Sequence, residues 1–159
     1  MKYSIKELRE LGLTEEQIEA IQNTYKEEAK KFFEETAKKY KDILAEHELY
    51  ATGTTGTMIM GETKLDIFRY KSGPEGGDQQ IGAMIAEGKL DVLIFFCDNL
   101  ITQGHQQDVG ALSRLASLYN IPFATNRTTA DMLVTSPLIC DEEYERIIPS
   151  AIDNYKRRM

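Results

Sequence analysis

Residues 50–57 read YATGTTGT, and residues 71–80 read KSGPEGGDQQ. Each glycine-rich stretch follows a short apolar run, ELYAT at 48–52 and DIFRYK at 66–71. Glycine lets a backbone turn sharply and approach a ligand closely, and neighbouring hydroxyl groups add hydrogen-bond donors. Both stretches are therefore typical of turns that follow strands, and the rest of the sequence indicates what kind of sheet those strands form.

The second half of the chain alternates between strand-like and helix-like segments. Two more apolar runs, DVLIFFC and IPFAT, bring the number of predicted strands to four, and three helical stretches separate or follow them. These segments are residues 91–97 and 121–125 for the strands and 79–87, 107–119 and 128–134 for the helices. The order predicts an α/β fold of three layers, α/β/α, with a parallel sheet covered by helices on both faces.

The first 46 residues have a different texture, rich in lysine and glutamate, with apolar residues at helical spacing. Thr14 followed by Gln17 predicts a capping box at a helix start. Thr24 followed by Glu27 predicts a second start, with a break near Asn23. We therefore expect a helical extension over residues 1–25 that packs on the sheet, within one domain that spans residues 1–159.

Composition limits the classes of partner. The chain has 159 residues, of which 42% are hydrophobic, enough for one domain with its own core. Its net charge of −7 opposes binding to nucleic acid. The longest apolar run is too short to cross a membrane, and the charged N-terminus is unlike a signal peptide, so we expect a cytoplasmic protein without a membrane partner. Cys97 and Cys140 lack metal-ligand spacing, so we expect free or buried thiols and no metal.

The two turns together predict an anion site. In open α/β sheets a ligand lies beyond the carboxyl ends of the strands, where the following turns converge. There the hydroxyls of Thr52, Thr54 and Thr55 can meet an anion at a helix N-terminus, beside the Ser72 hydroxyl and the Gly73 amide. Taken singly, each stretch is also consistent with a plain turn. Neither matches a Walker or dinucleotide-binding pattern, so we expect no nucleotide cofactor.

Four further polar residues fall at the same predicted edge: Asp78, Asp98, His105 and Asp108. Three of them have a simpler interpretation, because Asp78 and Asp108 suit helix N-caps and His105 suits a surface loop. As a group beside a phosphate cradle, however, carboxylates and a histidine are suited to proton transfer. The set predicts proton abstraction from a phosphorylated carbonyl compound.

Four long segments carry a resemblance to the methylglyoxal synthase family. They are LYATGTTG (49–56), SGPEGGDQQIGAMIAEGKLDVLIFFCD (72–98), HQQDVGALSRLA (105–116) and IPFATNRTTADMLVTSP (121–137). The resemblance covers about residues 26–149. It implies a carbon–oxygen lyase that converts dihydroxyacetone phosphate into methylglyoxal and inorganic phosphate, with no metal or organic cofactor. It also implies a homohexamer that inorganic phosphate inhibits.

The same resemblance assigns roles to residues. Asp78 is implied as the catalytic base, with Asp98, His105 and Asp108 as further catalytic residues. The residues implied to bind the substrate phosphate are Lys30, Thr52, Thr54, Thr55, Ser72 and Gly73.

The chain departs from the family at its N-terminal side. Family members begin with a central strand that ends in a His-Asp turn, whereas this chain has helical spacing there and carries Lys26 and Glu27 at the turn. We therefore expect a four-stranded parallel sheet in which the two strands that would flank the missing one pair directly. A second interpretation stays open: a catalytically impaired phosphate- or phosphoester-binding module of the same fold, regulatory or engineered, like that of carbamoyl phosphate synthetase.

Overall fold

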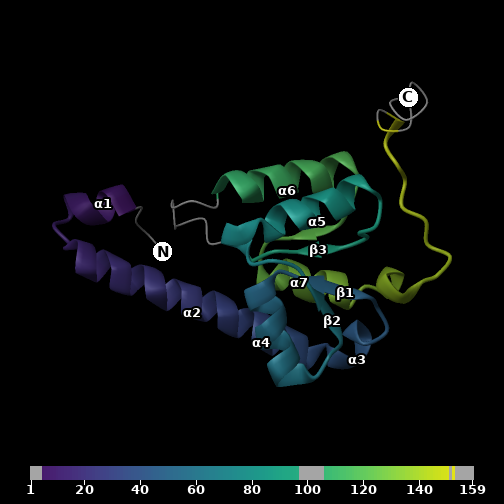
Figure 1. Ribbon diagram of the computed structural model, residues 1–159, viewed down its shortest axis with the longest axis horizontal. Coiled ribbons are helices and arrows are strands. Elements are labelled where there is room, and N and C mark those ends of the chain that lie inside the picture. Colours follow the sequence, from purple (N-terminus) through teal and green to yellow (C-terminus); the bar gives the residue numbers. More distant parts are fainter. Residues whose placement is uncertain (1–4, 97–105, 151, 153–159) are drawn as a thin grey trace.

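A computed structural model describes residues 5–96, 106–150 and 152 (Figure 1). Helices and short parallel strands alternate through these residues. The elements are α1 (Ile5–Glu10), α2 (Glu15–Lys39), α3 (Lys41–Leu44), β1 (Leu49–Ala51), α4 (Gly53–Thr63), β2 (Ile67–Arg69), η1 (Gly73–Glu75), α5 (Gly77–Ala86), β3 (Leu93–Ile94), α6 (Gln106–Leu118), β4 (Phe123–Ala124), α7 (Arg127–Val134) and η2 (Pro137–Cys140). The α/β class is confirmed, and every predicted strand and helix of the second half overlaps an observed element of the same type.

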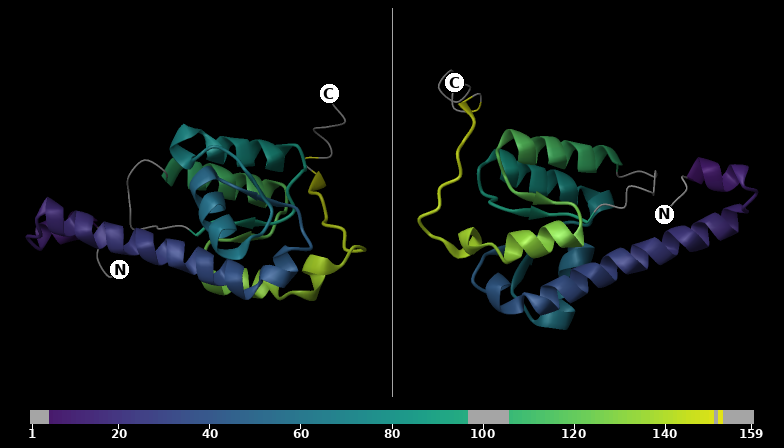
Figure 2. Two further views of the ribbon diagram at one scale, coloured as in Figure 1. Left: turned by 60° about the horizontal axis from the view of Figure 1, so that its bottom comes forward. Right: turned by 180° about the vertical axis from the view of Figure 1, so that it is seen from behind.

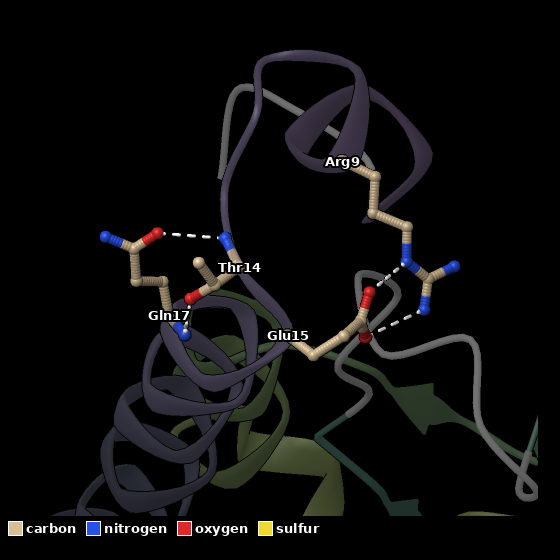
Figure 3. A network of polar contacts seen from close by, with 4 residues as sticks. All are labelled: Arg9, Thr14, Glu15 and Gln17. Carbon is tan, nitrogen blue, oxygen red and sulfur yellow. Dashed lines mark hydrogen bonds and ion pairs between the residues drawn. The ribbon is translucent and has the colours of Figure 1, made fainter.

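Helix α2 begins at the predicted capping box. The Thr14 amide donates to Gln17 Oε1 at 2.9 Å, and the Gln17 amide donates to Thr14 Oγ1 at 3.2 Å (Figure 3). Beside them, Arg9 Nε donates to Glu15 Oε1 at 2.8 Å and links the end of α1 to the first turn of α2. The two hydrogen bonds between Thr14 and Gln17 satisfy two backbone amides that a helix start otherwise leaves unpaired.

The predicted break near Asn23 is wrong, because α2 runs unbroken through 25 residues. Thr24 does not cap a second helix: its hydroxyl donates to the Ala20 carbonyl oxygen at 3.0 Å, a back-bond within the helix. Helix α2 can be this long because its N-terminal part extends beyond the body of the molecule and does not have to fit within it (Figures 1 and 2).

Over its described residues, 5–25, the N-terminal extension does not pack on the sheet, which corrects the prediction. Helix α1 folds back on α2, where Leu8 and Ile18 form a small buried cluster against Leu13 and Ile21. Figures 1 and 2 show this helical hairpin pointing away from the strands. Leu8 and Ile18 are thus buried within the hairpin itself, without contact with the sheet.

The second half of α2 is fixed to the body by polar contacts with α4 and α7. Lys38 Nζ lies 2.6 Å from Glu62 Oε2 of α4, and Arg127 Nη1 of α7 lies 2.6 Å from Glu35 Oε2. At the end of the helix, the Tyr40 hydroxyl donates to Asp131 Oδ1 of α7 at 2.5 Å. These contacts fix the direction in which α2 leaves the body.

The strands form two separate parallel pairs. Strand β1 pairs with β2, with Leu49 opposite Ile67, and β3 pairs with β4, with Leu93 opposite Phe123. Among the described residues no strand of one pair bonds to a strand of the other, so the expected single four-stranded sheet, with the two neighbours of the missing strand paired directly, is wrong. A cavity lined by residues of β1 and β3 lies between the two pairs, with Phe33 of α2 on its wall.

The main core lies between β3 and the helix pair α5 and α6. Ile81 and Ile85 of α5 pack with Leu93 of β3 and with Leu112 and Ala116 of α6. Helices α5 and α6 lie on one side of the strands and α7 on the other (Figure 1). The part of the chain that the structure describes contains no helix long and apolar enough to span a membrane, and Cys140 is an exposed, free cysteine.

Candidate active site

The first glycine-rich turn opens helix α4, as predicted. Thr52 is the N-cap residue, with an extended backbone at φ −67° and ψ 155°. Among the described residues, the Thr52 side chain makes no capping hydrogen bond to its own helix. The amides of the second and third helical residues, Thr54 and Thr55, have no carbonyl partner within α4, because the first turn of any helix lacks one. The turn thus presents amides and hydroxyls to a ligand.

The second turn is shaped by close backbone packing. Gly76 has φ +97°, a left-handed conformation that favours glycine. At Gly77 an added Cβ would lie 2.0 Å from the Lys71 carbonyl oxygen, so only glycine fits there. The Lys71 amide in turn donates to Gln80 Oε1 at 2.9 Å, which holds the start of the turn against α5.

The two turns are in contact, as the sequence predicted from parallel strands. The Gly53 amide donates to the Lys71 carbonyl oxygen at 3.1 Å, and an added Cβ at Gly53 would lie 3.3 Å from the Ser72 nitrogen. Pairing of β1 with β2 produces this contact, because both turns follow the carboxyl ends of neighbouring strands.

One cavity brings four of the predicted residues together. This inner cavity, of about 1190 Å³, lies between the two strand pairs, and its lining includes Thr52, Thr55, Gly73 and Asp78. Asp78 is only 6% exposed and lies in the first turn of α5. A carboxylate there is favoured by the positive end of the helix dipole, and its burial restricts the water around it. Two of the predicted threonines, the glycine of the second turn and a buried acid thus share one cavity lining.

Two other predicted residues line a different space. Thr54 and Ser72 line the outer groove, a depression of about 1560 Å³ along the β1–β2 pair that also includes Arg69, Lys71 and Glu75. Thr55 lines the inner cavity while Thr54 lines the outer groove, in keeping with the separation of about 100° between consecutive residues of a helix. Ser72 Oγ donates to Glu75 Oε2 at 2.6 Å within this groove.

Among the described residues, Lys30 lines neither the inner cavity nor the outer groove. It lies on the exposed surface of α2, and its ammonium group is 2.7 Å from Glu27 Oε1. Glu27, which stands where the family resemblance implies an aspartate, is therefore paired with Lys30 on the helix surface.

The remaining predicted residues are not placed. Asp98 and His105 lie outside the described residues. Asp108 belongs to the first turn of α6 by its backbone position, and its side chain is outside the description. Among the side chains that the structure does describe, no cluster of three or more histidine, cysteine or acidic residues could hold a metal ion.

Sequence reasoning missed Glu75. Hydrogen bonds from the Ser72 hydroxyl and then from the Ser72 amide lower the pKa of the Glu75 carboxyl. Desolvation opposes them in part, and the charge of Lys71 adds a smaller lowering. The signal was available in the sequence: Ser72 followed three residues later by Glu75 has the Ser-x-x-Glu spacing of a local hydrogen-bonded pair.

Comparison with known proteins defines the class first. Residues 33–125 match the family described as the MGS-like domain, a match that includes both turns and Asp78. The crystal structure of methylglyoxal synthase from Elizabethkingia anophelis is similar, with a TM-score of 0.69 and 41% sequence identity, over 79% of this chain and 81% of that one.

Curated relatives identify the family within this class of protein. A methylglyoxal synthase of Leptospira interrogans is 54% identical over 113 residues, which are 71% of this chain and 76% of the relative. One of Pseudoalteromonas atlantica is 57% identical over 110 residues, 69% of this chain and 82% of the relative. The chain belongs to the methylglyoxal synthase family.

Proposed function

We propose that this protein is a carbon–oxygen lyase that converts dihydroxyacetone phosphate into methylglyoxal and inorganic phosphate. The observation that carries the proposal is the inner cavity, where buried Asp78 shares one lining with Thr52, Thr55 and Gly73. The names of relatives more than 50% identical to this chain support the same reaction.

The chemistry needs a base and an anion site held in fixed relation. In the proposed reaction Asp78 removes a proton from the hydroxymethyl carbon beside the carbonyl group, which gives an enediolate. The cradle of amides and hydroxyls holds the phosphate so that its C–O bond lies in line with the π system of the enediolate. Cleavage of that bond releases inorganic phosphate and the enol of methylglyoxal, which tautomerises to the product.

Further roles are proposed from the family resemblance. Asp98, His105 and Asp108 would exchange protons with the substrate oxygens. Lys30 would need to leave Glu27 before it contributes charge to the phosphate. A homohexamer and inhibition by inorganic phosphate are proposed on the same ground. We also propose a single domain over residues 1–159, in which residues 1–25 are a helical extension and residues 26–159 are the methylglyoxal synthase-like region.

A direct assay tests the lyase. Purified protein is given dihydroxyacetone phosphate, and the release of methylglyoxal and of phosphate is followed together. Replacing Asp78 with asparagine keeps its shape but removes its basicity, so we expect kcat to fall by about 10²-fold or more. Asp42→Asn on exposed α3 is the matched control and should leave turnover unchanged. Full turnover by Asp78→Asn would contradict the assignment of the base.

The binding module remains a second candidate because of two observations. The strand pairs are not joined between β1 and β3 among the described residues, and Lys30 is engaged by Glu27. A protein of this kind would keep the cradle and bind phosphate or a phosphoester without chemistry. Calorimetric binding of inorganic phosphate, together with no methylglyoxal release by the unaltered chain, would favour the module over the lyase.

A further inference from the structure

Glu75 lies inside the second turn and engages one of its hydrogen-bond donors. It is the last residue of η1, and its Oε2 atom accepts a hydrogen bond from Ser72 Oγ at 2.6 Å. Ser72 is one of the residues proposed to hold the substrate phosphate. A carboxylate of the chain itself thus occupies a donor that a phosphate oxygen would use.

The contact with Glu75 also determines which of the two spaces, the outer groove or the inner cavity, the Ser72 hydroxyl serves. Ser72 and Glu75 both line the outer groove, while Gly73 and Asp78 line the inner cavity. A serine hydroxyl has a single proton to donate. As long as that proton goes to Glu75, it cannot go to a phosphate in the inner cavity, so use of Ser72 by a ligand requires the Glu75 contact to break.

The negative charge of Glu75 also opposes the binding of phosphate. The Ser72 hydrogen bonds and the nearby Lys71 lower the pKa of Glu75, so this carboxyl stays ionised near neutral pH. An ionised carboxylate beside the cradle repels an incoming phosphate dianion. Lys71 offsets part of that repulsion, since it lines the same outer groove.

We propose that Glu75 is a specificity-determining residue that competes with the phosphate group of the ligand for Ser72. It thereby weakens the binding of phosphate monoesters and of inorganic phosphate. The inference rests on the proposed function, because it takes Ser72 as part of the phosphate cradle. One consequence is easier release of inorganic phosphate after each turnover.

Calorimetric titration with inorganic phosphate tests the competition on the full-length protein. Glu75→Ala removes both the charge and the acceptor, and we expect it to lower the Kd about three- to tenfold. Glu75→Gln removes the charge and keeps an acceptor, so its gain should be smaller. Glu142→Gln, an exposed glutamate that lines neither space, is the matched control and should leave the Kd unchanged. The charge-dependent part of the gain should shrink at high salt.

A double-mutant cycle tests whether the effect passes through Ser72. In a Ser72→Ala background, Glu75→Ala should give a clearly smaller gain, because the contact that it frees no longer exists. Equal Kd values for the unaltered chain and Glu75→Ala would overturn the proposal, and so would an undiminished gain in the Ser72→Ala background.

Turnover separates this inference from the proposed lyase. If the lyase is active, Glu75→Ala should lower KM for dihydroxyacetone phosphate with a smaller effect on kcat. Absent turnover with the expected changes in phosphate Kd would refute the lyase and support the competition. Turnover by every variant, with no phosphate binding detectable in any of them, would overturn the competition while the lyase stands.

Discussion

At the scale of single residues, Gly77 shows how closely the candidate site is built. The Lys71 carbonyl oxygen occupies the space where a side chain of residue 77 would begin, 2.0 Å from an added Cβ. Asp78 follows directly, so the position of the proposed base depends on this close approach. A change at Gly77 therefore displaces the second turn and the start of α5 together.

Gly77→Ala should lower the free energy of unfolding by about 1–3 kcal/mol, because the added methyl group must push the Lys71 backbone aside. Gly61→Ala is the matched control: Gly61 lies within α4 with open space around it, and the exchange should stabilise the helix by about 0.5–1 kcal/mol. Urea denaturation of both variants measures the difference. Equal stability of the two variants would show that the turn relaxes without cost.

At the scale of elements, α2 has two parts: an N-terminal arm that extends from the body and a C-terminal part that contacts the body. Its first turns carry the small cluster with α1, and its last turns hold α4 and α7 through ion pairs. Because the arm is remote from the main core, the stability of its start is set by local interactions, above all by the capping box at Thr14.

Thr14→Ala should cost about 1 kcal/mol of local helix stability, since it removes the hydroxyl that accepts a hydrogen bond from the Gln17 amide and leaves only the bond from the Thr14 amide to Gln17 Oε1. Thr24→Ala is the matched control, because the Thr24 hydroxyl only back-bonds within the helix and alanine has the higher helix propensity. Amide hydrogen exchange over residues 15–22 should become faster in Thr14→Ala and not in Thr24→Ala. Unchanged protection in Thr14→Ala would show that packing against α1, not the cap, holds the helix start.

At the scale of the whole molecule, contacts distant in sequence hold the helices around the strands. The hydrogen bond from the Tyr40 hydroxyl to Asp131 joins the end of α2 to α7, 91 positions apart. Accepting this bond is the largest cause that lowers the pKa of Asp131 below its ordinary 3.8, and Lys39 and Arg127 add to it. The contact therefore makes stability depend on pH.

The direction of the pKa shift of Asp131 determines how stability changes with pH. A carboxyl with a lowered pKa in the folded state stabilises the fold above its ordinary pKa, and this stabilisation is lost as the pH falls through the folded-state value. Tyr40→Phe should therefore lower Tm by a few degrees at pH 7 and pH 5, with a difference that shrinks below about pH 3.8.

Tyr50→Phe provides the comparison for that experiment. The Tyr50 hydroxyl bonds Glu48, only two residues away on an exposed segment, so its removal should change Tm little. Thermal unfolding followed by circular dichroism at several pH values measures both variants. A Tyr40→Phe effect of the same size at every pH would assign the loss to packing and not to Asp131.

The sequence alone determined the local elements and the meeting of the two turns. Short apolar runs, helical spacing, the Thr14 cap and the glycine positions are local signals, and they predicted the strands and helices of the second half, the start of α2 and the adjacent turns correctly. The order of alternation fixed the α/β class, because strands of a parallel sheet end at one edge. The family motifs gave the activity that we propose.

Only the tertiary structure decided how these elements are joined. The division of the strands into two pairs depends on what lies between β1 and β3, which no local pattern states. The unbroken α2 and its outward direction follow from anchors at Glu62, Arg127 and Asp131, which are distant in sequence. Likewise the engagement of Ser72 by Glu75, and of Lys30 by Glu27, depends on side-chain geometry, because a hydroxyl or an ammonium group binds the acceptor that the fold places nearest.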